Sequence, residues 1–186
     1  KSLIELGVKP GEIITVCMSN YAQAVEIFLA ANKIGVTVSF INSFAKKEET
    51  IKYLNYFESP VFVNYNKDED YNREIKGKTK VRNIITLDKN DLNRKDFNKI
   101  NGNLIGYNDL VTFSDLGLIS DFQRGYFKTN FNGNQDALIL FTSGTTGEPK
   151  SVLITNKNIL ASGIYTKNTC EIKPTADESC LVCVPF

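Results

Sequence analysis

Residues 137–154 read ALILFTSGTTGEPKSVLI, and this order of apolar and polar residues decides how the rest of the chain is interpreted. The apolar run 137–141 predicts a strand, and 151–154 predict a second one. Between them, residues 142–150 hold four hydroxyl side chains, two glycines and one lysine. Glycines let a backbone approach a ligand closely, successive amides can converge on an anion, and hydroxyls donate to phosphate oxygens. The stretch therefore predicts a loop that binds a polyanion, with Lys150 as a compact positive charge.

Two other interpretations of this loop are weaker. A polar surface hairpin needs only two or three turn residues, fewer than this loop has. The nucleotide P-loop, G-x-x-x-x-G-K-[ST], is matched at Gly144, Lys150 and Ser151, but Pro149 stands where its second glycine belongs. Proline has no N–H to donate, and a strand is predicted here where a P-loop leads into a helix. The sequence thus indicates a phosphate loop of another class.

The first half of the chain alternates short apolar runs with helical patterns. Strands are predicted at 12–18, 36–41 and 61–63, because these runs are rich in β-branched and apolar residues. One helix is predicted between the first two strands, and another over 46–57 with acidic residues near its positive end. Alternation of this kind predicts an α/β fold with a parallel sheet.

The helix after the first strand carries its own start and stop signals. Asn20 is expected to cap it, and Gln23, three positions on, would complete a capping box. Gly35 stands where a left-handed residue ends a helix. The apolar residues that recur at helical spacing are Val25, Phe28, Leu29 and Ile34.

The remainder of the chain gives weaker signals. Residues 64–134 are rich in Asn, Lys and Asp, which we interpret as compositional bias with turn propensity. Within them, 81–87 predict a strand and 107–113 a short helix. After the phosphate loop, a helix is predicted over 156–166 with Thr155 as its cap.

Composition excludes several classes of function. The chain has 186 residues, of which 42% are apolar and 23% charged, and a formal net charge of +1, which is ordinary for a globular domain. This charge balance gives no reason to expect nucleic acid as a partner, and no apolar run approaches the length of a membrane span. The absence of histidine excludes a Ser-His-Asp triad or a histidine-ligated zinc within these residues.

The four cysteines do not indicate a metal or redox site. Cys180 and Cys183 form a Cys-x-x-Cys pair, but they fall in an apolar run that predicts a last strand at 179–184. Residues three apart in a strand point to opposite faces, so the two sulfurs cannot share a metal without a bend in the backbone. Scattered thiols without a secretory leader fit a reducing compartment, and a cytoplasmic location is expected.

At residues 142–150 the sequence resembles the adenylate-forming superfamily of AMP-binding enzymes, which includes acyl-CoA synthetases, peptide-synthetase adenylation domains and luciferases. The signature of that family is a Ser/Thr/Gly-rich loop ending in Pro-Lys-Gly, and Thr142–Lys150 match it position by position between two predicted strands. Residues 6–12, 33–35 and 38–42 are also similar to the family's N-terminal segment. One departure is Ser151, where the family usually has glycine.

This resemblance covers nearly the whole chain and implies its place in a larger unit. We expect a layered α/β subdomain with a mostly parallel sheet. Residues 1–186 would be an incomplete N-terminal portion of an AMP-binding domain, with no separate second domain. By resemblance, the magnesium glutamate, the adenine and ribose contacts and the C-terminal lysine lie beyond Phe186. The resemblance therefore implies no complete catalytic set in these residues, and no adenylation activity for residues 1–186 alone.

The resemblance also implies an ATP-dependent ligase that activates a carboxylate. Such enzymes join a carboxylate to ATP, form an acyl-adenylate and pyrophosphate, and in most branches pass the acyl group to a thiol. The expected substrates are a small carboxylic acid (a fatty acid among the candidates), ATP and coenzyme A. Thr142 would contact Mg²⁺. The residues expected to hold the β- and γ-phosphates are Thr142, Ser143, Gly144, Thr145, Thr146, Gly147 and Lys150.

Two alternatives stay open within this resemblance. One is a peptide-synthetase-type adenylation domain that loads a carrier protein, and the other is a degenerate, non-catalytic AMP-binding relative. Thr145 and the stretch Phe40–Ser43 resemble acyl-CoA synthetases more than peptide synthetases. A carrier domain after the C-terminus would favour the first alternative, and loss of the downstream glutamate or lysine would favour the second. Neither the acid nor the oligomeric state can be read from the sequence.

Overall fold

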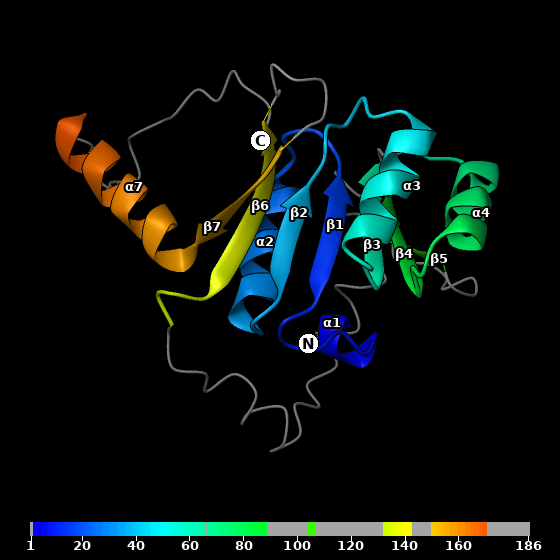
Figure 1. The fold of residues 1–186 in the computed structure, drawn as a ribbon, viewed down its shortest axis with the longest axis horizontal. Coiled ribbons are helices and arrows are strands. Elements are labelled where there is room, and N and C mark those ends of the chain that lie inside the picture. The colour runs from blue at the N-terminus through cyan, green and yellow to red at the C-terminus, as the bar shows by residue number, and fades with distance from the viewer. Residues whose placement is uncertain (1, 66, 89–103, 107–131, 143–149, 171–186) are drawn as a thin grey trace.

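The computed structural model shows a seven-stranded sheet with helices on both of its faces (Figure 1). It describes residues 2–65, 67–88, 104–106, 132–142 and 150–170. The strands are β1 (Ile13–Cys17), β2 (Thr37–Phe40), β3 (Val61–Tyr65), β4 (Asn83–Leu87), β5 (Leu104–Gly106), β6 (Asp136–Thr142) and β7 (Lys150–Thr155). Their order across the sheet is β5-β4-β3-β1-β2-β6-β7, and every neighbouring pair is parallel except β6 with β7. No helix in this part of the chain is long and apolar enough to cross a membrane.

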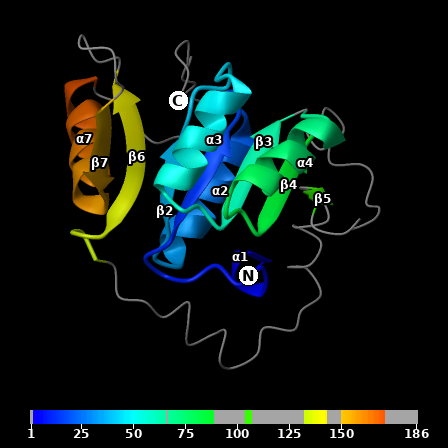
Figure 2. The same cartoon turned by 45° about the vertical axis from the view of Figure 1, so that its right-hand side comes forward.

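The helices cover both faces of this sheet. They are α1 (Ser2–Glu5), α2 (Ala22–Lys33), α3 (Lys47–Tyr56), α4 (Glu69–Lys78) and α7 (Asn156–Thr169). Figures 1 and 2 show α2 on one side of the central strands, and α3 with α4 on the other. This arrangement confirms the predicted layered α/β fold with a mostly parallel sheet.

Each face has its own hydrophobic cluster, because the central strands of a parallel sheet are buried on both sides. On the α2 side, Ile27 and Ala31 lie in one cluster with Val16 of β1. On the opposite side, Leu54 of α3 lies in a second cluster with Phe62 of β3, and both side chains are fully buried. Strands β1 to β4 therefore form the packed centre of the molecule.

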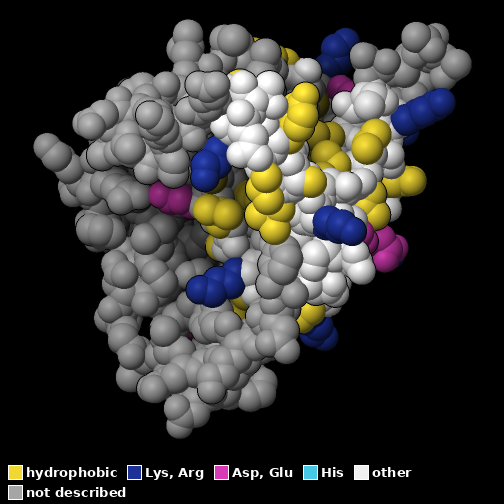
Figure 3. Space-filling view, turned by 90° about the vertical axis from the view of Figure 1, so that its left-hand side faces the viewer, with side chains coloured by type: hydrophobic (Ala, Val, Ile, Leu, Met, Phe, Trp, Pro, Cys, Tyr) yellow, Lys and Arg dark blue, Asp and Glu magenta, His cyan; other side chains and the backbone are white. Residues whose placement is uncertain are grey.

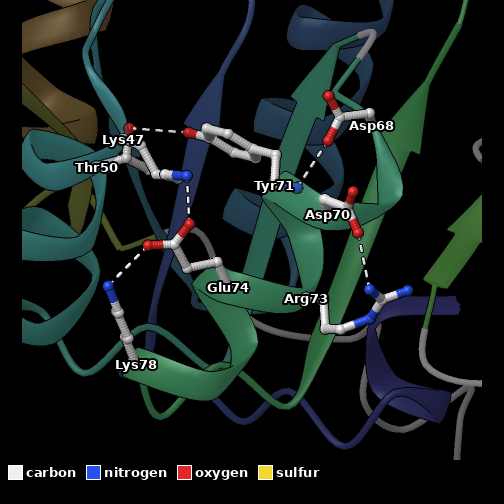
Figure 4. Close-up of polar contacts among 8 residues, drawn as sticks. All are labelled: Lys47, Thr50, Asp68, Asp70, Tyr71, Arg73, Glu74 and Lys78. Atoms are coloured by element: carbon white, nitrogen blue, oxygen red, sulfur yellow. Dashed lines mark hydrogen bonds and ion pairs between the residues drawn. The ribbon is translucent and has the colours of Figure 1, made fainter.

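Polar side chains join α3 to α4 (Figure 4). The Glu74 carboxylate accepts hydrogen bonds from Lys47 of α3 and, at 2.7 Å, from Lys78 of its own helix. Tyr71 donates its hydroxyl hydrogen to Thr50 Oγ1 at 3.2 Å. The hydrogen bond from Lys47, and after it the one from Lys78, lower the pKa of Glu74 from 4.5 to about 2.

Most predicted elements lie where the sequence placed them. The strands predicted at 12–18, 36–41, 61–63 and 81–87 match β1 to β4 to within two residues at each end. The helix predicted over 46–57 matches α3, and the one predicted over 156–166 continues to Thr169 as α7. The predicted helix at 107–113 and the predicted strand at 179–184, with Cys180 and Cys183, lie outside the described residues.

The start of α2 differs from the prediction. The helix begins at Ala22, with Tyr21 at its N-cap and no side-chain cap hydrogen bond. The predicted capping box of Asn20 with Gln23 is therefore wrong. The reason is local, since the Tyr21 N–H donates to the Ser19 carbonyl at 2.7 Å, and this tight turn moves the start of the helix past Asn20.

The side of α2 that packs on the sheet agrees only in part with the apolar pattern of the sequence. Val25 and Leu29 are 43% and 60% exposed, whereas Ala24 and Ala31 are buried. Ile34 is buried and Phe28 packs against the core cluster, as their spacing predicts, and Ile27 is buried as well. Leu29 is the predicted residue that lies on the outer side of the helix. The end of the helix agrees with the prediction, because Gly35 has a φ of 77°.

Helix α4 has no counterpart in the sequence-based prediction. Asp68 caps it by accepting a hydrogen bond from the Tyr71 N–H at 2.7 Å. Only Asn72 and Ile75 are buried among its residues. Most of its residues are polar or charged, so its sequence lacks the recurring apolar residues from which a helix is predicted.

Candidate functional site

The site predicted from the sequence lies at the end of a β-hairpin formed by β6 and β7. These strands are antiparallel, and their last Cα partners are Thr142 and Lys150. The Thr142 hydroxyl donates to the Lys150 carbonyl at 3.4 Å, and both residues are exposed. The predicted contacts between them, Ser143, Gly144, Thr145, Thr146 and Gly147, lie outside the described residues.

The sheet topology places this hairpin end at the edge where ligands bind in parallel α/β sheets. Strand β6 is parallel to β2, and β2 is parallel to β1, so Thr142 lies at the carboxyl edge of the sheet. Ligands of open α/β sheets bind outside the carboxyl ends of the strands. The position of Thr142 and Lys150 therefore fits a binding loop, which the sequence alone could not place relative to the other strands.

The base of β6 is fixed to β2. Val38 and Ser39 of β2 pair with Leu138 and Ile139. The Thr37 hydroxyl adds a hydrogen bond of 3.0 Å to the Asp136 carbonyl. The strand therefore enters the sheet in a defined register before it runs to the exposed end of the hairpin.

The far side of the hairpin is fixed by the start of α7. Thr155 caps this helix in a capping box with Asn158, as predicted for Thr155. Asn156 is 8% exposed and donates from Nδ2 to the Asn132 carbonyl at 3.3 Å. Its backbone N–H donates to the Gln135 carbonyl at 3.0 Å. These bonds tie the return from β7 to the segment that leads into β6.

The hydroxyl and amine at the hairpin end fit an anion together with a hard cation. The Thr142 hydroxyl hydrogen points to the Lys150 carbonyl, so the lone pairs of its oxygen stay free for a cation. Hard cations such as Mg²⁺ prefer oxygen ligands of this type. Lys150 is exposed, so its ammonium can meet a phosphate. Within the described ranges, no group of three or more His, Cys, Asp or Glu side chains could hold a metal ion.

The thiol near this edge of the sheet is not a candidate nucleophile. Cys17, the last residue of β1, is buried and donates to the Asn42 carbonyl at 3.5 Å. Burial, partly opposed by Lys67, raises the pKa of Cys17 to about 11. A thiol with so high a pKa is almost entirely protonated at neutral pH, and the thiolate is the reactive form.

Sequence reasoning missed an aromatic contact beside the loop. Phe141, directly before Thr142, lies with its ring centroid 4.2 Å from that of Tyr53 on α3 and 5.9 Å from that of Phe57. The aromatic residues at these three positions are visible in the sequence, but only the pairing of β6 with β2 brings them together. No local spacing could have shown this contact.

An apolar cavity of about 320 Å³ lies on the opposite face of β6. Figure 3 views the molecule from the α7 side and shows hydrophobic side chains gathered on this face. Several of the hydrophobic residues nearby, including Leu160 and Ile164 of α7, are more than half exposed. The residues that line the cavity are Val25, Phe28, Phe40, Leu138, Leu140 and Ile159.

Comparison with known proteins gives a family match and several similar proteins. A family model described as AMP-binding enzyme matches residues 1–186. The 4-coumarate–CoA ligase 3 of Arabidopsis thaliana is 26% identical over 160 residues, which are 86% of this chain and 25% of that protein. Nonribosomal peptide synthetase 2 of Cochliobolus heterostrophus is 39% identical over 57 residues, which are 31% of this chain and 1% of that protein.

A solved structure shares the fold. The crystal structure of an anthranilate CoA ligase in complex with anthranoyl-AMP has a TM-score of 0.69 and 20% sequence identity, and the match covers 90% of this chain and 29% of that chain. The present chain thus spans about a quarter of the length of the coumarate ligase and less than a third of the anthranilate ligase.

Proposed function

The chain belongs to the AMP-binding enzyme family, and on that premise we propose that it forms the phosphate-binding part of an ATP-dependent ligase that activates carboxylates. The ligase would join a small carboxylic acid to ATP, release pyrophosphate and form an acyl-adenylate. It would then transfer the acyl group to coenzyme A. The coumarate and anthranilate ligases to which the chain is similar both carry CoA ligase in their names, which supports the thioester step.

One observation carries this proposal: the two ends of the Thr142–Lys150 loop lie side by side at the carboxyl edge of the sheet. The loop sequence supplies hydroxyls, glycines and one lysine, which suit the β- and γ-phosphates. Attack of a carboxylate on the α-phosphorus needs positioning and charge neutralisation more than covalent help from the protein. A loop held at both ends by paired strands can supply both.

The residues of the proposed site divide the binding of ATP and Mg²⁺ between them. Lys150 neutralises charge on the phosphates that leave as pyrophosphate. Thr142 binds Mg²⁺ through its hydroxyl oxygen, and the ion would offset the charge of the triphosphate when bound. We assign Ser143, Gly144, Thr145, Thr146 and Gly147 to the phosphates through their hydroxyls and backbone amides.

The test is carboxylate-dependent ATP–pyrophosphate exchange by the full-length protein. Lys150→Ala should lower kcat/KM for ATP about 10²-fold, the scale for removing one electrostatic contact to developing charge. Lys157→Ala removes a lysine at the start of α7 that is also exposed, and it should leave the exchange unchanged. Absence of exchange across a broad panel of acids, including fatty acids, would refute the ligase. An unchanged rate in Lys150→Ala would remove the lysine from the mechanism.

We also propose that residues 1–186 are an incomplete N-terminal portion of the AMP-binding domain. The chain covers only 25% of the coumarate ligase, which supports this division. The chain alone should therefore catalyse no exchange, and exchange by the purified chain would contradict the division. We place the protein in the cytoplasm, a proposal supported by the free thiols of Cys17 and Cys170.

A second candidate function is the adenylation domain of a peptide synthetase. Its support is the 39% identity to nonribosomal peptide synthetase 2, although that match covers only 31% of this chain, against 86% for the coumarate ligase. The two functions differ in the acceptor thiol. Transfer of the acyl group to free coenzyme A would establish the first, and transfer only to a pantetheine on a carrier protein would establish the second.

A further inference from the structure

The end of β6 that carries Thr142 is paired with the sheet on one side only. Its pairing with β2 consists of Val38 with Leu138 and Ser39 with Ile139. Beyond Ile139, the last three residues of β6 pair only with β7. Strand β7 lies at the edge of the sheet, so it cannot tie them to the centre. Some other contact must set where Thr142 lies.

The ring of Phe141 provides such a contact. It packs against the cluster on the α3 side of the sheet, with its centroid 4.2 Å from Tyr53 and 5.9 Å from Phe57. Successive side chains of a strand point to opposite faces. Leu140 lines the cavity on the other face, so Phe141 points toward α3 and Thr142 points away from it.

Tyr53, against which this ring packs, is itself held in place. Tyr53 is 8% exposed, and its hydroxyl donates to Glu49 Oε1 at 3.1 Å. Leu54, beside it on α3, is fully buried in the same cluster. The hydrogen bonds of Glu74 and Tyr71 join α3 to α4, as Figure 4 shows. The ring of Phe141, packed against α3, therefore links the end of β6 to the centre of the molecule.

We propose that Phe141 is a positioning residue, whose contact with Tyr53 and Phe57 sets the end of β6 so that Thr142 and Lys150 meet the ATP phosphates in one orientation. This inference rests on the proposed function. Phe141 itself touches no phosphate, because its ring lies on the α3 face of the sheet. Small errors of position matter in such sites, since a misplacement of about 1 Å can cost about 10²-fold in rate.

The experiment measures ATP–pyrophosphate exchange by the full-length protein with Phe141→Ala. The KM for ATP should rise about tenfold or more, whereas the KM for the carboxylate should stay within about twofold, because the loop and not the acid pocket is displaced. Phe141→Tyr keeps a ring of the same shape and should restore the KM for ATP. A purely structural role of Phe141 would lower the amount of active enzyme without changing either KM.

Two control variants separate positioning from stability. Ile85→Ala removes a fully buried side chain of β4 and should lower Tm at least as much as Phe141→Ala, yet leave the KM for ATP unchanged. Tyr56→Ala removes a ring that lies edge-on to Phe57 but is 70% exposed, and it should change neither quantity. An unchanged KM for ATP in Phe141→Ala, or an equal rise in Ile85→Ala, would overturn the proposal.

A double-mutant cycle tests the contact if Phe141→Ala does not fold. Phe141→Leu and Tyr53→Leu each keep an apolar side chain, and their effects on the KM for ATP should be less than additive, because either change breaks the same contact. Additive effects would overturn the proposal. Failure of the proposed function looks different: the unaltered protein would then show no exchange. Normal exchange by that protein, with Phe141→Ala unchanged, would refute the positioning role alone.

Discussion

The centre of the sheet and the β6–β7 hairpin differ in how deeply their residues are buried. In β1 and β3, four of five residues are buried, and both faces of these strands are covered by helices. In β7, four of six residues are exposed, and α7 buries only Asn156. The comparison indicates that stability resides in the central strands, whereas the residues with candidate chemistry stand on a lightly packed extension.

This division has a physical reason. A loop that binds a polyanion must keep its hydroxyls, amides and lysine accessible, so it cannot be packed like a core. It must also be held in one place, which requires a rigid support. The pairing of β6 with β2 and the ring of Phe141 supply that support from the packed side. Mutations can therefore test whether the more deeply buried centre also contributes more to the free energy of unfolding than the hairpin does.

The largest effect is expected in the centre, from Phe62→Ala. Among the described residues, Phe62 of β3 is the largest fully buried side chain, and it lies in one cluster with Leu54 of α3 and Ile75 of α4. Its truncation should lower the free energy of unfolding by about 4 kcal/mol, because a large cavity is left in a core that cannot collapse fully. Urea denaturation followed by circular dichroism measures this loss.

The corresponding truncation in the hairpin, of a smaller side chain, is Val152→Ala. Val152 lies on β7 and is 43% exposed, so its truncation should cost less than about 1 kcal/mol. A loss similar to that of Phe62→Ala would show that the hairpin contributes to the core of the protein, and the comparison would fail.

The centre of the fold was predictable because its signals are local. Runs such as 12–18 and 61–63 are continuous and apolar, and a buried parallel strand needs no more than that. The cap of α7 was predictable for the same reason, since Thr155 and Asn158 are three residues apart. The start of α2 was not, because the tight turn at Ser19 and Tyr21 overrides the preference of Asn20 for a cap.

The residues of the site could be predicted from the sequence, but their position in the fold could not. The composition of residues 142–150 indicated phosphate binding, but nothing in it indicates that β6 lies beside β2, about 100 positions earlier in the chain. The contact of Phe141 with Tyr53 depends on that pairing. The asparagines of residues 64–134 were interpreted as compositional bias. Two of them, Asn64 and Asn72, are instead buried residues of the structure.

A smaller effect than that of Phe62→Ala is expected for Asn72→Ala in α4. Asn72 accepts from Asn64 Nδ2 at 2.9 Å and donates to Thr86 Oγ1 at 3.2 Å, and the Thr86 hydroxyl donates to Asn64 Oδ1 at 3.1 Å. Removing one member leaves buried polar atoms without partners, so the free energy of unfolding should fall by about 2 kcal/mol. Urea denaturation measures this change.

The control for Asn72 is Asn55→Ala. Asn55 also donates a hydrogen bond, to the Lys78 carbonyl at 3.0 Å, but its side chain is exposed. Water can replace that bond, so the loss should be well under that of Asn72→Ala. Equal losses would show that burial of the α4 network adds nothing to the stability of the centre.

A smaller effect, visible only through its pH dependence, is expected for Glu74→Gln. The pKa of Glu74 in the folded protein is about 2, below its ordinary 4.5, because Lys47 and Lys78 donate to the carboxylate. The unfolded chain therefore binds the proton more readily, so this contribution to stability is present above about pH 4.5 and is lost as the pH falls towards 2. The urea midpoints of the original protein and the variant should converge over that range.

The control for Glu74 is Glu58→Gln. Glu58 pairs with Lys80, but both side chains are about two-thirds exposed, whereas that of Glu74 is 33% exposed. Solvent screens the more exposed pair, so its difference in midpoint should be small at every pH. A difference for Glu74→Gln that stays constant between pH 7 and pH 2 would contradict the role assigned to its charge.

The smallest effect is expected on the outer side of α2, for Leu29→Gln. Leu29 is 60% exposed on the same helix on which Ile27 is 4% exposed. Leu29→Gln should change the free energy of unfolding by less than about 0.5 kcal/mol. Ile27→Ala, two residues away, should cost about 3 kcal/mol. If the larger loss occurs at Leu29, the apolar pattern of the sequence reports the packed side of α2 after all. If it occurs at Ile27, the boundary between the packed centre and the exposed surface runs along α2, between the side that carries Ile27 and the side that carries Leu29.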